Sequence, residues 1–340
     1  MLHFDSDYME GAHPEILKRL SEINFHKYSG YGTDAICESA REKIRGACGC
    51  PEATIHFLVG GTQTNATVIR GLLRPFQGVL APDSGHISLH EAGAVEAGGH
   101  KVIAIGNRDG KLYAGDVREY LLGFYGDENH PHMVKPGMVY ISHPTEYGTL
   151  YTRQELEELS KVCREYKIPL YLDGARLSYA LAAKGTDVTL KVIAENCDVF
   201  YIGGTKTGAM MGEAVVFPRF VPEDFFTIVK QSGALMAKGW MLGVQFDVLF
   251  TEGLYLECGK NGIKTAGMLR EGLRNMGYSF YIDSPTNQLF VVLENRKMEE
   301  LKEEVSFSFW EALDKSHTVV RFATSWATQE DEVEKLLSFL

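Results

Sequence analysis

Three short segments carry residue types that could do chemistry, and each follows an apolar run. In the segment VFYIGGTKTGAMMG (199–212), an apolar run is followed by two glycines, and Lys206 comes shortly after them among small residues. In LYLDGAR, Asp173 follows an apolar run in the same way, and in LVGGTQTN two glycines and Thr62 open a helical pattern. Because ligands of open α/β sheets bind beyond the carboxyl ends of the strands, these three strand ends are the first candidates for a site.

Together the three segments supply what pyridoxal 5′-phosphate (PLP) needs from a protein. A lysine whose pKa is lowered by a dry site or a neighbouring cation can form a Schiff base with the aldehyde of the cofactor. An aspartate can hold the ring nitrogen protonated, and free N–H groups at a helix start can bind the phosphate. Taken singly, each segment has a simpler interpretation: a solvated lysine, an aspartate that caps a helix, and a tight turn.

Two nucleotide-binding motifs and one metal motif are excluded. A Walker A loop would have glycines where Phe200 and Thr205 stand, and no G-x-G-x-x-G opens a helix after a strand. In GHISLHEAGA, two histidines are spaced as zinc ligands on a helix, but Ile87 stands where H-E-x-x-H has its glutamate. We therefore expect no metal, and interpret His86 either as a ring that stacks on the pyridine face or as a structural histidine.

Short β-rich runs alternate with helical patterns, which predicts an α/β fold with a mostly parallel sheet covered by helices on both faces. The expected strands are ATIHFLVGG, GVLAP, KVIAIG, GMVYISHP, IPLYLDGAR, CDVFYIGG and EAVVFP. The strongest helical pattern is 152–167, where Thr152 and Glu155 form a capping box. A long helical stretch (223–250), a second helix (about 255–276), further strands and a final helix predict a smaller α+β unit.

The composition is that of an ordinary globular chain, with 340 residues of which 45% are hydrophobic and 23% charged. Its net charge is −11 and no basic tract stands out, so neither nucleic acid nor an anionic membrane is an expected partner. The six cysteines are too dispersed for a disulfide framework. The first residues, MLHFDSDYMEGAHP, show no secretory signal, and no apolar run reaches about 18 residues. We expect a cytoplasmic protein.

The order of the motifs GGTQTN, GHISLHEAGA, LYLDGAR and GGTK resembles that of the threonine aldolase and β-eliminating lyase family of fold-type-I PLP-dependent enzymes. The opening FDSDYMEGAHPEIL resembles the N-terminal S-D-T-x-x-P element of that family, and GYGTD resembles its Tyr-Gly-Asp loop. The resemblance runs nearly end to end. It implies an N-terminal segment that contributes to the active site (1–25), a large PLP-binding domain (26–250) and a small C-terminal α+β domain (251–340).

The resemblance also implies a role for each matching residue. Lys206 would form the Schiff base, Asp173 would pair with the pyridine nitrogen, and His86 would stack on the ring. The expected catalytic residues are Lys206, His86, Asp173 and Glu146. The expected cofactor-binding residues are Lys206, Gly61, Thr62, His86, Asp173, Arg176, Thr205 and the loosely aligned Lys238. The expected substrate-binding residues are Ser6, Tyr31, Arg176 and Arg321.

Arg321 and Tyr31 can act at the site only if a condition is met for each of them. Arg321 interrupts an apolar strand, and such an arginine is unfavourable unless an anion meets it; a substrate carboxylate or a buried salt bridge would do so. Tyr31 would reach the site across a subunit boundary, because the family forms dimers or dimers of dimers with shared sites. We therefore expect a homodimer or homotetramer.

Glu146 marks a departure from the family pattern. Members often carry a histidine near the substrate hydroxyl in an N-T-H-N-G segment, and here SHPTEYGTL places Glu146 at that position. The lysine loop reads GGTKTGA rather than the commoner S-K-G. Glu146 is either a base for the reaction or a residue that acts through another, and the chain belongs to a divergent branch.

The implied reaction is the retro-aldol cleavage of a β-hydroxy-α-amino acid, such as L-threonine or L-allo-threonine, to glycine and acetaldehyde. A base takes the β-hydroxyl proton, and His86, Glu146 or a water is the candidate, while the ring with Asp173 holds the carbanion. The same residues would serve a β-eliminating lyase, a racemase or an aminotransferase, and a cofactor-bearing protein without turnover is a further alternative. The aldehyde half of the substrate, the threo or erythro preference and the choice between dimer and tetramer stay open.

Overall fold

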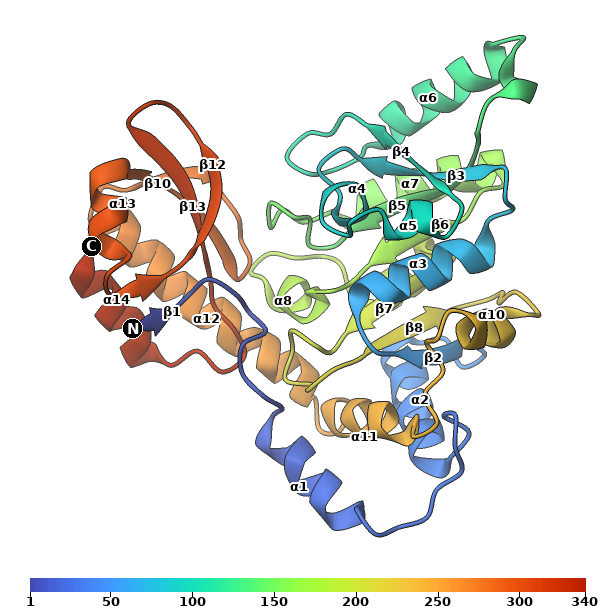
Figure 1. Ribbon diagram of the computed structural model, residues 1–340, viewed down its shortest axis with the longest axis horizontal. Coiled ribbons are helices and arrows are strands. Elements are labelled where there is room, and N and C mark those ends of the chain that lie inside the picture. Colours follow the sequence, from blue (N-terminus) through green and yellow to red (C-terminus); the bar gives the residue numbers. More distant parts are fainter.

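A seven-stranded sheet forms the core of the larger of two lobes in the computed structural model, which describes residues 1–340 (Figure 1). The strands follow the spatial order β2-β8-β7-β6-β5-β3-β4. The predicted parallel sheet is confirmed from β7 to β4, whereas β8 lies antiparallel between β2 and β7. The strands are β2 (Thr54–Leu58), β3 (Gln77–Pro82), β4 (Lys101–Ile105), β5 (Lys135–Ser142), β6 (Leu170–Asp173), β7 (Val199–Gly203) and β8 (Glu213–Phe217).

Side chains that alternate along the central strands enter two separate cores, so the sheet is buried on both faces. In β7, Phe200 and Ile202 join one core, and Val199 and Tyr201 join the other. The helices over the first core are α1 (Pro14–Ile23), α2 (Ala35–Cys48), α6 (Ala114–Gly126), α7 (Arg153–Tyr166), α8 (Leu177–Ala182), α9 (Leu190–Asn196) and α11 (Trp240–Leu249). Those over the second are α3 (Gly61–Leu72), α4 (His86–Leu89), α5 (Ala94–Ala97) and α10 (Phe225–Gln231).

The prediction of one long helical stretch over 223–250 is wrong. The structure divides it into α10 and α11, which are separated by a loop. Gly233 takes a left-handed φ of 69° just after the end of α10, a conformation that ends a helix. The loop then packs against the segment that contains Tyr31, whose backbone N–H donates to the carbonyl oxygen of Ala237 at 3.1 Å.

The smaller lobe is built on a four-stranded antiparallel sheet in the order β12-β13-β10-β9. Its elements are β9 (Ser279–Ile282), β10 (Gln288–Glu294), α13 (Asn295–Leu301), β12 (Ser308–Ala312), β13 (His317–Ala323) and α14 (Glu330–Phe339). The start of the chain joins this lobe, because β1 (Leu2–His3) pairs with β11 (Val305–Ser306). The N-terminal segment thus runs from the small lobe toward the large one (Figure 1).

The long helix α12 (Leu254–Asn275) connects the two lobes (Figure 1). Near its start it packs closely on α8, where a Cβ on Gly259 would lie 2.4 Å from the carbonyl oxygen of Ser178. A Cβ on Gly262 would lie 2.5 Å from the ring of Tyr179. The hydroxyl of Tyr179 donates to the carbonyl oxygen of Lys206 at 2.6 Å. The seating of α12 therefore helps to place the lysine loop.

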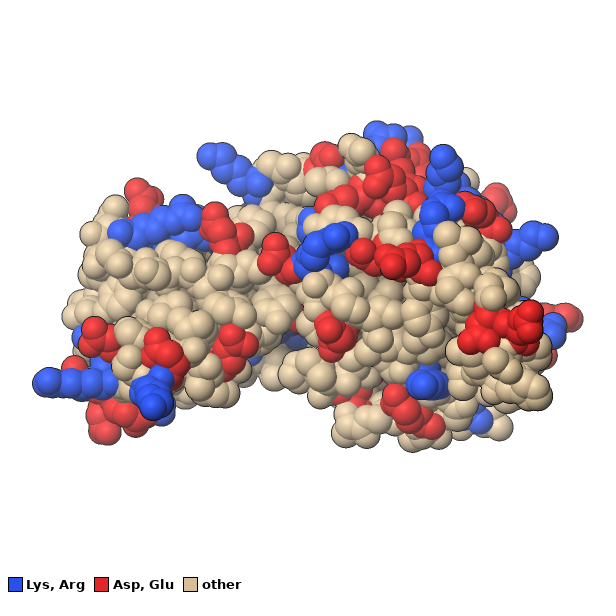
Figure 2. All heavy atoms as spheres, turned by 90° about the horizontal axis from the view of Figure 1, so that it is seen from above, with Lys and Arg blue, Asp and Glu red and all other residues tan.

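The surface shows no gathering of basic side chains on the face drawn in Figure 2, where Lys and Arg lie among Asp and Glu. This face therefore lacks the contiguous positive surface with which proteins bind nucleic-acid backbones. No helix combines the length and the apolar character needed to span a bilayer. All six cysteines are free.

Candidate active site

Lys206 lies in the loop that follows β7, as the sequence predicts. The end of β7, just before this loop, packs against the loop after β6 without room for a side chain, since a Cβ on Gly203 would lie 2.4 Å from the carbonyl oxygen of Ala175. The Lys206 ammonium lies 5.6 Å from the ring centroid of Tyr8. Burial, together with the charge of Arg176, lowers the pKa of Lys206. A lowered pKa makes an amine a better nucleophile at neutral pH.

Asp173 ends β6, and its side chain is held on both oxygens. Its Oδ1 accepts hydrogen bonds from Tyr201 Oη at 2.5 Å and from the Ala175 N–H at 3.0 Å. Its Oδ2 accepts from Tyr140 Oη at 2.7 Å and from Asn65 Nδ2 at 2.9 Å. The residue is only 4% exposed. The sheet and α3 thus fix one orientation of this carboxylate.

His86 begins α4 and reaches the same network. Its Nδ1 lies 2.8 Å from Glu91 Oε1, which also accepts from Asn65 Nδ2 at 2.7 Å. Burial acts to lower the pKa of His86, but Glu91 and the charge of Asp173 outweigh it and raise the pKa. Burial acts to raise the pKa of Asp173, but the charge of His86 and the hydrogen bonds outweigh it and lower the pKa. The pair therefore favours a charged imidazole beside an ionised Asp173.

Glu146 lies next to His86, in the loop after β5. Its Oε1 accepts from Ser142 Oγ at 2.7 Å and from the backbone N–H of His86 at 2.9 Å. Its Oε2 is buried and has no hydrogen-bond partner. Burial raises the pKa of Glu146, and the negative charge of Asp173 adds to this effect. The structure thus brings Glu146, His86 and Asp173 together.

The N-terminus of α3 offers an open anion-binding position beside Asp173. Gly60 caps the helix without a side-chain hydrogen bond, and a Cβ there would meet nothing within 4 Å. A Cβ on Gly61 would lie 3.2 Å from Tyr201 Oη, so the helix start is close to a tyrosine that binds Asp173. Asn65 follows one helical turn after Gly61. Free N–H groups for a phosphate and a carboxylate for a ring nitrogen therefore lie near each other, and these residues fit PLP.

Arg176 is engaged within the chain by a partner that the sequence did not indicate. Its Nε and Nη2 donate to the two carboxylate oxygens of Asp7 at 2.6 and 2.9 Å. Asp7 is completely buried. Burial acts to raise the pKa of Asp7, but Arg176 outweighs it and lowers the pKa to about 2. Arg176 is thus held in place by the N-terminal segment.

Arg321 and Ser6 carry buried atoms without partners. In Arg321, Nη1 donates to Gln288 Oε1 at 3.1 Å and Nη2 donates to the Asp5 carbonyl and to Ser308 Oγ, also at 3.1 Å. Its Nε is buried and unpartnered, and so is Ser6 Oγ. Buried donors without acceptors are rare in proteins, so this region is suited to an anionic ligand.

Thr205 turns toward a buried glutamate. Its hydroxyl donates to Glu213 Oε1 at 2.8 Å and accepts from the Gly212 N–H at 3.1 Å. The N–H of Gly204 donates to Glu213 Oε2 at 3.2 Å. Burial raises the pKa of Glu213 to about 8, although the charge of Lys206 opposes this shift. In this chain Thr205 shapes the lysine loop, and Glu213 is a neighbour of Lys206 that the sequence did not reveal.

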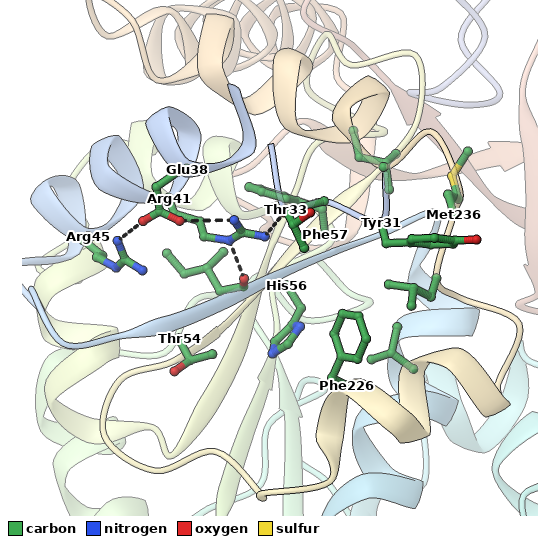
Figure 3. Close-up of a pocket in the computed structure, with 16 residues that line it drawn as sticks. Tyr31, Thr33, Glu38, Arg41, Arg45, Thr54, His56, Phe57, Phe226 and Met236 are labelled. Atoms are coloured by element: carbon green, nitrogen blue, oxygen red, sulfur yellow. Dashed lines mark hydrogen bonds and ion pairs between the residues drawn. The ribbon is translucent and has the colours of Figure 1, made fainter. Parts of the chain in front are cut away.

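Tyr31 and Lys238 do not lie with Lys206 in the single chain. Tyr31 borders a separate cavity of about 300 Å³, beside His56, Phe226 and Met236 (Figure 3). Lys238 is exposed on the loop that contacts Tyr31. The two residues are therefore close to each other, and none of the other predicted site residues lines this cavity.

Several polar residues of the site were not expected from the sequence. They are Asp7, Asn65, Glu91, Tyr140, Ser142, Tyr201 and Glu213. The sequence contained one signal that could have indicated the role of Tyr140 and Tyr201. Side chains two apart in a strand share a face, so Tyr171 and Asp173 define the face of β6 on which tyrosines of the neighbouring strands could also lie.

The fold and the site define a fold-type-I architecture. A tetra mutant of the aspartate aminotransferase of Thermus thermophilus shares it, with a TM-score of 0.74 and 17% identity over 99% of this chain and 95% of that chain. The chain belongs to the β-eliminating lyase family, whose model matches residues 3–296.

Two relatives of this chain carry a more specific name. A low-specificity L-threonine aldolase of Pseudomonas sp. (strain NCIMB 10558) is 28% identical over 337 residues, which cover 98% of this chain and 95% of the relative. The structure of a threonine aldolase of Leishmania major matches with a TM-score of 0.94 and 42% identity, over 99% of this chain and 98% of that chain.

Proposed function

We propose that this chain is a PLP-dependent aldolase that cleaves a β-hydroxy-α-amino acid, L-threonine or L-allo-threonine, into glycine and acetaldehyde. The observation that carries the proposal is the convergence of Lys206, Asp173 and the N-terminus of α3 on one buried site. The threonine aldolase relatives, at 28% and 42% identity over nearly the whole chain, favour retro-aldol cleavage over the other reactions of this site.

The cofactor end of the site depends on groups of the large lobe. PLP bound there supplies the electron sink for the carbanion that is left when the Cα–Cβ bond breaks. Lys206 would hold the cofactor aldehyde, and Gly61 and Thr62 would present backbone N–H groups to its phosphate. Asp173 keeps a proton on the ring nitrogen, because its own pKa is lowered and it stays ionised. His86 lies beside it, where its imidazole can stack on the ring.

The substrate end depends on Arg321, Ser6 and Arg176. The unpartnered Nε of Arg321 and Oγ of Ser6 bind the substrate carboxylate, and Arg176, which is held by its pair with Asp7, adds a positive charge near Arg321. Arginine suits this task because its planar group can grip a carboxylate with two hydrogen bonds.

Glu146 is the proposed base that takes the proton of the substrate β-hydroxyl. Its Oε2 has no partner in the chain and is free to accept that proton. Its raised pKa makes Glu146 a stronger base than an ordinary carboxylate, and general-base catalysis improves as the pKa of the base approaches the operating pH. A carboxylate here would take the place of the histidine that other family members carry.

The proposed assembly is a homodimer or homotetramer with shared sites. Tyr31 and Lys238 lie on adjacent loops and away from Lys206 of their own chain. We assign them to the active site of a neighbouring subunit, with Lys238 directed to the phosphate. The N-terminal segment (1–25) would serve its own site through Ser6 and Asp7, and the division at 26–250 and 251–340 stays a prediction.

The proposal is tested with purified protein supplied with PLP. We expect a visible absorbance band, which Lys206→Ala abolishes and the exposed control Lys260→Ala retains. Added L-threonine or L-allo-threonine should yield glycine and an aldehyde. Pyruvate with ammonia would indicate β-elimination, an epimer would indicate a racemase, and a keto acid would indicate an aminotransferase. A chain that binds no PLP would overturn the proposal as a whole.

A further inference from the structure

A row of hydrogen-bonded groups connects Glu146 with Asp173. Glu146 Oε1 lies 2.7 Å from Ser142 Oγ, and Ser142 Oγ lies 3.1 Å from Tyr140 Oη. Tyr140 Oη lies 2.7 Å from Asp173 Oδ2. Tyr140, Ser142 and Asp173 are all buried, so the row is shielded from water. The proposed base and the proposed partner of the ring nitrogen are thus joined through two hydroxyl groups.

A second row returns from Asp173 to Glu146. Asn65 donates to Asp173 Oδ2 at 2.9 Å and to Glu91 Oε1 at 2.7 Å. Glu91 Oε1 lies 2.8 Å from Nδ1 of His86, whose backbone N–H donates to Glu146 Oε1 at 2.9 Å. The two rows close a ring, which fixes the positions of both carboxylates relative to each other.

The charge of Glu146 determines how many of the oxygen–oxygen contacts in the first row, from Glu146 to Asp173, hold a hydrogen. Tyr140 has one hydroxyl hydrogen, and the charged Asp173 takes it. Ser142 also has one, but it faces two acceptors, Tyr140 and Glu146. When Glu146 carries its proton on Oε1, that oxygen donates to Ser142, Ser142 donates to Tyr140, and every contact holds a hydrogen. When Glu146 is ionised, Ser142 donates to Glu146 and the Ser142–Tyr140 contact holds none.

We propose that Ser142 and Tyr140 form a hydroxyl relay, in which the loss of the proton from Glu146 reverses the Ser142 hydroxyl and weakens the hydrogen bond from Tyr140 to Asp173. A hydroxyl that accepts a hydrogen bond donates a stronger one, so Tyr140 donates less strongly once Ser142 has turned away. Ionised Glu146 then coincides with a more basic Asp173. Ser142 and Tyr140 are positioning residues, and the link to catalysis rests on the proposed function.

The surroundings of Glu146 determine how clear the effect will be. The groups that face it are Asp173 from β6, Tyr140 and Ser142 from β5, His86 from α4, and the hydroxyls of Tyr147 and Tyr151. The charge of Asp173 acts on the pKa of Glu146 through space as well as through the relay. The test must therefore separate a Coulombic effect of Asp173 from an effect of the hydroxyls.

The matched pair Tyr140→Phe and Tyr201→Phe makes this separation. Each removes one tyrosine hydroxyl from Asp173, but only Tyr140 also contacts Ser142. In Tyr140→Phe the Ser142 hydrogen is left to Glu146, so the Glu146 pKa should fall by about one unit while the Asp173 pKa rises. In Tyr201→Phe the Asp173 pKa should rise and the Glu146 pKa should stay unchanged.

The measurement is infrared difference spectroscopy of the full-length chain with 13C-labelled glutamate, titrated from about pH 5 to about pH 9, with and without PLP. The band of Glu146 is identified by its absence in Glu146→Gln. Ser142→Ala is the second variant and should shift the Glu146 pKa upward, because the ionised form loses its donor, whereas the buried control Ser160→Ala should leave it unchanged.

An unchanged Glu146 titration in both Tyr140→Phe and Ser142→Ala would overturn the relay, and so would equal shifts in Tyr140→Phe and Tyr201→Phe. The spectra do not require turnover. A failed relay would therefore leave the aldolase proposal standing, and a failed aldolase assay would not alter the titration.

Discussion

The two ends of the site differ in how completely the chain satisfies their polar groups. Around Asp173, both carboxylate oxygens are hydrogen-bonded by side chains from α3, β5 and β7 and by a backbone N–H. Around Arg321 and Ser6, a guanidinium nitrogen and a hydroxyl are buried with no partner. At the first end the fold holds the carboxylate in one orientation, whereas at the second end buried donors are left for a ligand to pair.

This difference teaches which interactions set the rate and which set the affinity. Groups fixed before the ligand arrives need no reorganisation during the reaction, so the Asp173 end should act on kcat. Groups that lack a partner until the substrate carboxylate binds should act on KM. Two substitutions test this division, and the first should have the larger effect. A third substitution tests the ion pair that holds Arg176 at the substrate end.

Asp173→Asn should lower kcat roughly a thousandfold, in the upper range of losses seen when a group that stabilises developing charge is removed. The amide cannot keep a proton on the ring nitrogen, and its NH₂ group faces hydroxyl or amide donors that need acceptors. Steady-state cleavage of L-threonine measures the change. Asp283→Asn, an exposed residue paired with Arg274, is the control and should behave like the wild type. Equal kcat values in the two variants would contradict the role of Asp173.

Arg321→Lys should raise KM roughly 10- to 100-fold with little change in kcat, because lysine cannot supply the Nε donor or the planar fork. The measurement is the dependence of the rate on L-threonine concentration. Arg274→Lys is a conservative change at an exposed position and serves as the matched control. A fall in kcat at constant KM would indicate that Arg321 acts like Asp173, and it would contradict the division between the two ends of the site.

Asp7→Asn should reduce the free energy of unfolding by about 2 kcal/mol at neutral pH. The folded pKa of Asp7 is about 2, below its ordinary value of 3.8, and Arg176 is the cause that outweighs burial. This stabilisation is therefore fully present above the unfolded pKa and is lost as the pH falls through the folded pKa. Urea unfolding at neutral and acidic pH should show that the free energies of unfolding of the wild type and of Asp7→Asn converge in acid. A gap that persists at low pH would contradict the ion-pair explanation.

The sequence predicted the residues that stand where strands end. Lys206, Asp173 and Gly61 were visible because a polar or small residue interrupts an apolar run at a sheet edge where ligands bind. The parallel sheet was predictable for a related reason, since buried strands between helical patterns have few other arrangements. The local apolar pattern and the position of residues at the end of a strand were together sufficient to predict the fold and the centre of the site.

Residues in strand interiors escaped prediction because they look like core. Tyr140 and Tyr201 fit a buried strand as well as any apolar residue, and only the strand order shows that both reach Asp173. Asp7 was missed for another reason: its partner Arg176 is 169 positions away in the sequence. The break in 223–250 escaped because apolar periodicity continues across Gly233, whose left-handed conformation depends on the loop it begins.

The close seating of α12 on α8 has a consequence for natural variation and for library design. Positions 259 and 262 are closed to any residue larger than glycine, since a single added carbon would meet a carbonyl oxygen or a tyrosine ring at 2.4 or 2.5 Å. Gly267, on the same helix, has nothing within 4 Å of an added Cβ and is open to replacement. Diversity along this helix should therefore be uneven, with glycine retained at the two positions that pack on α8.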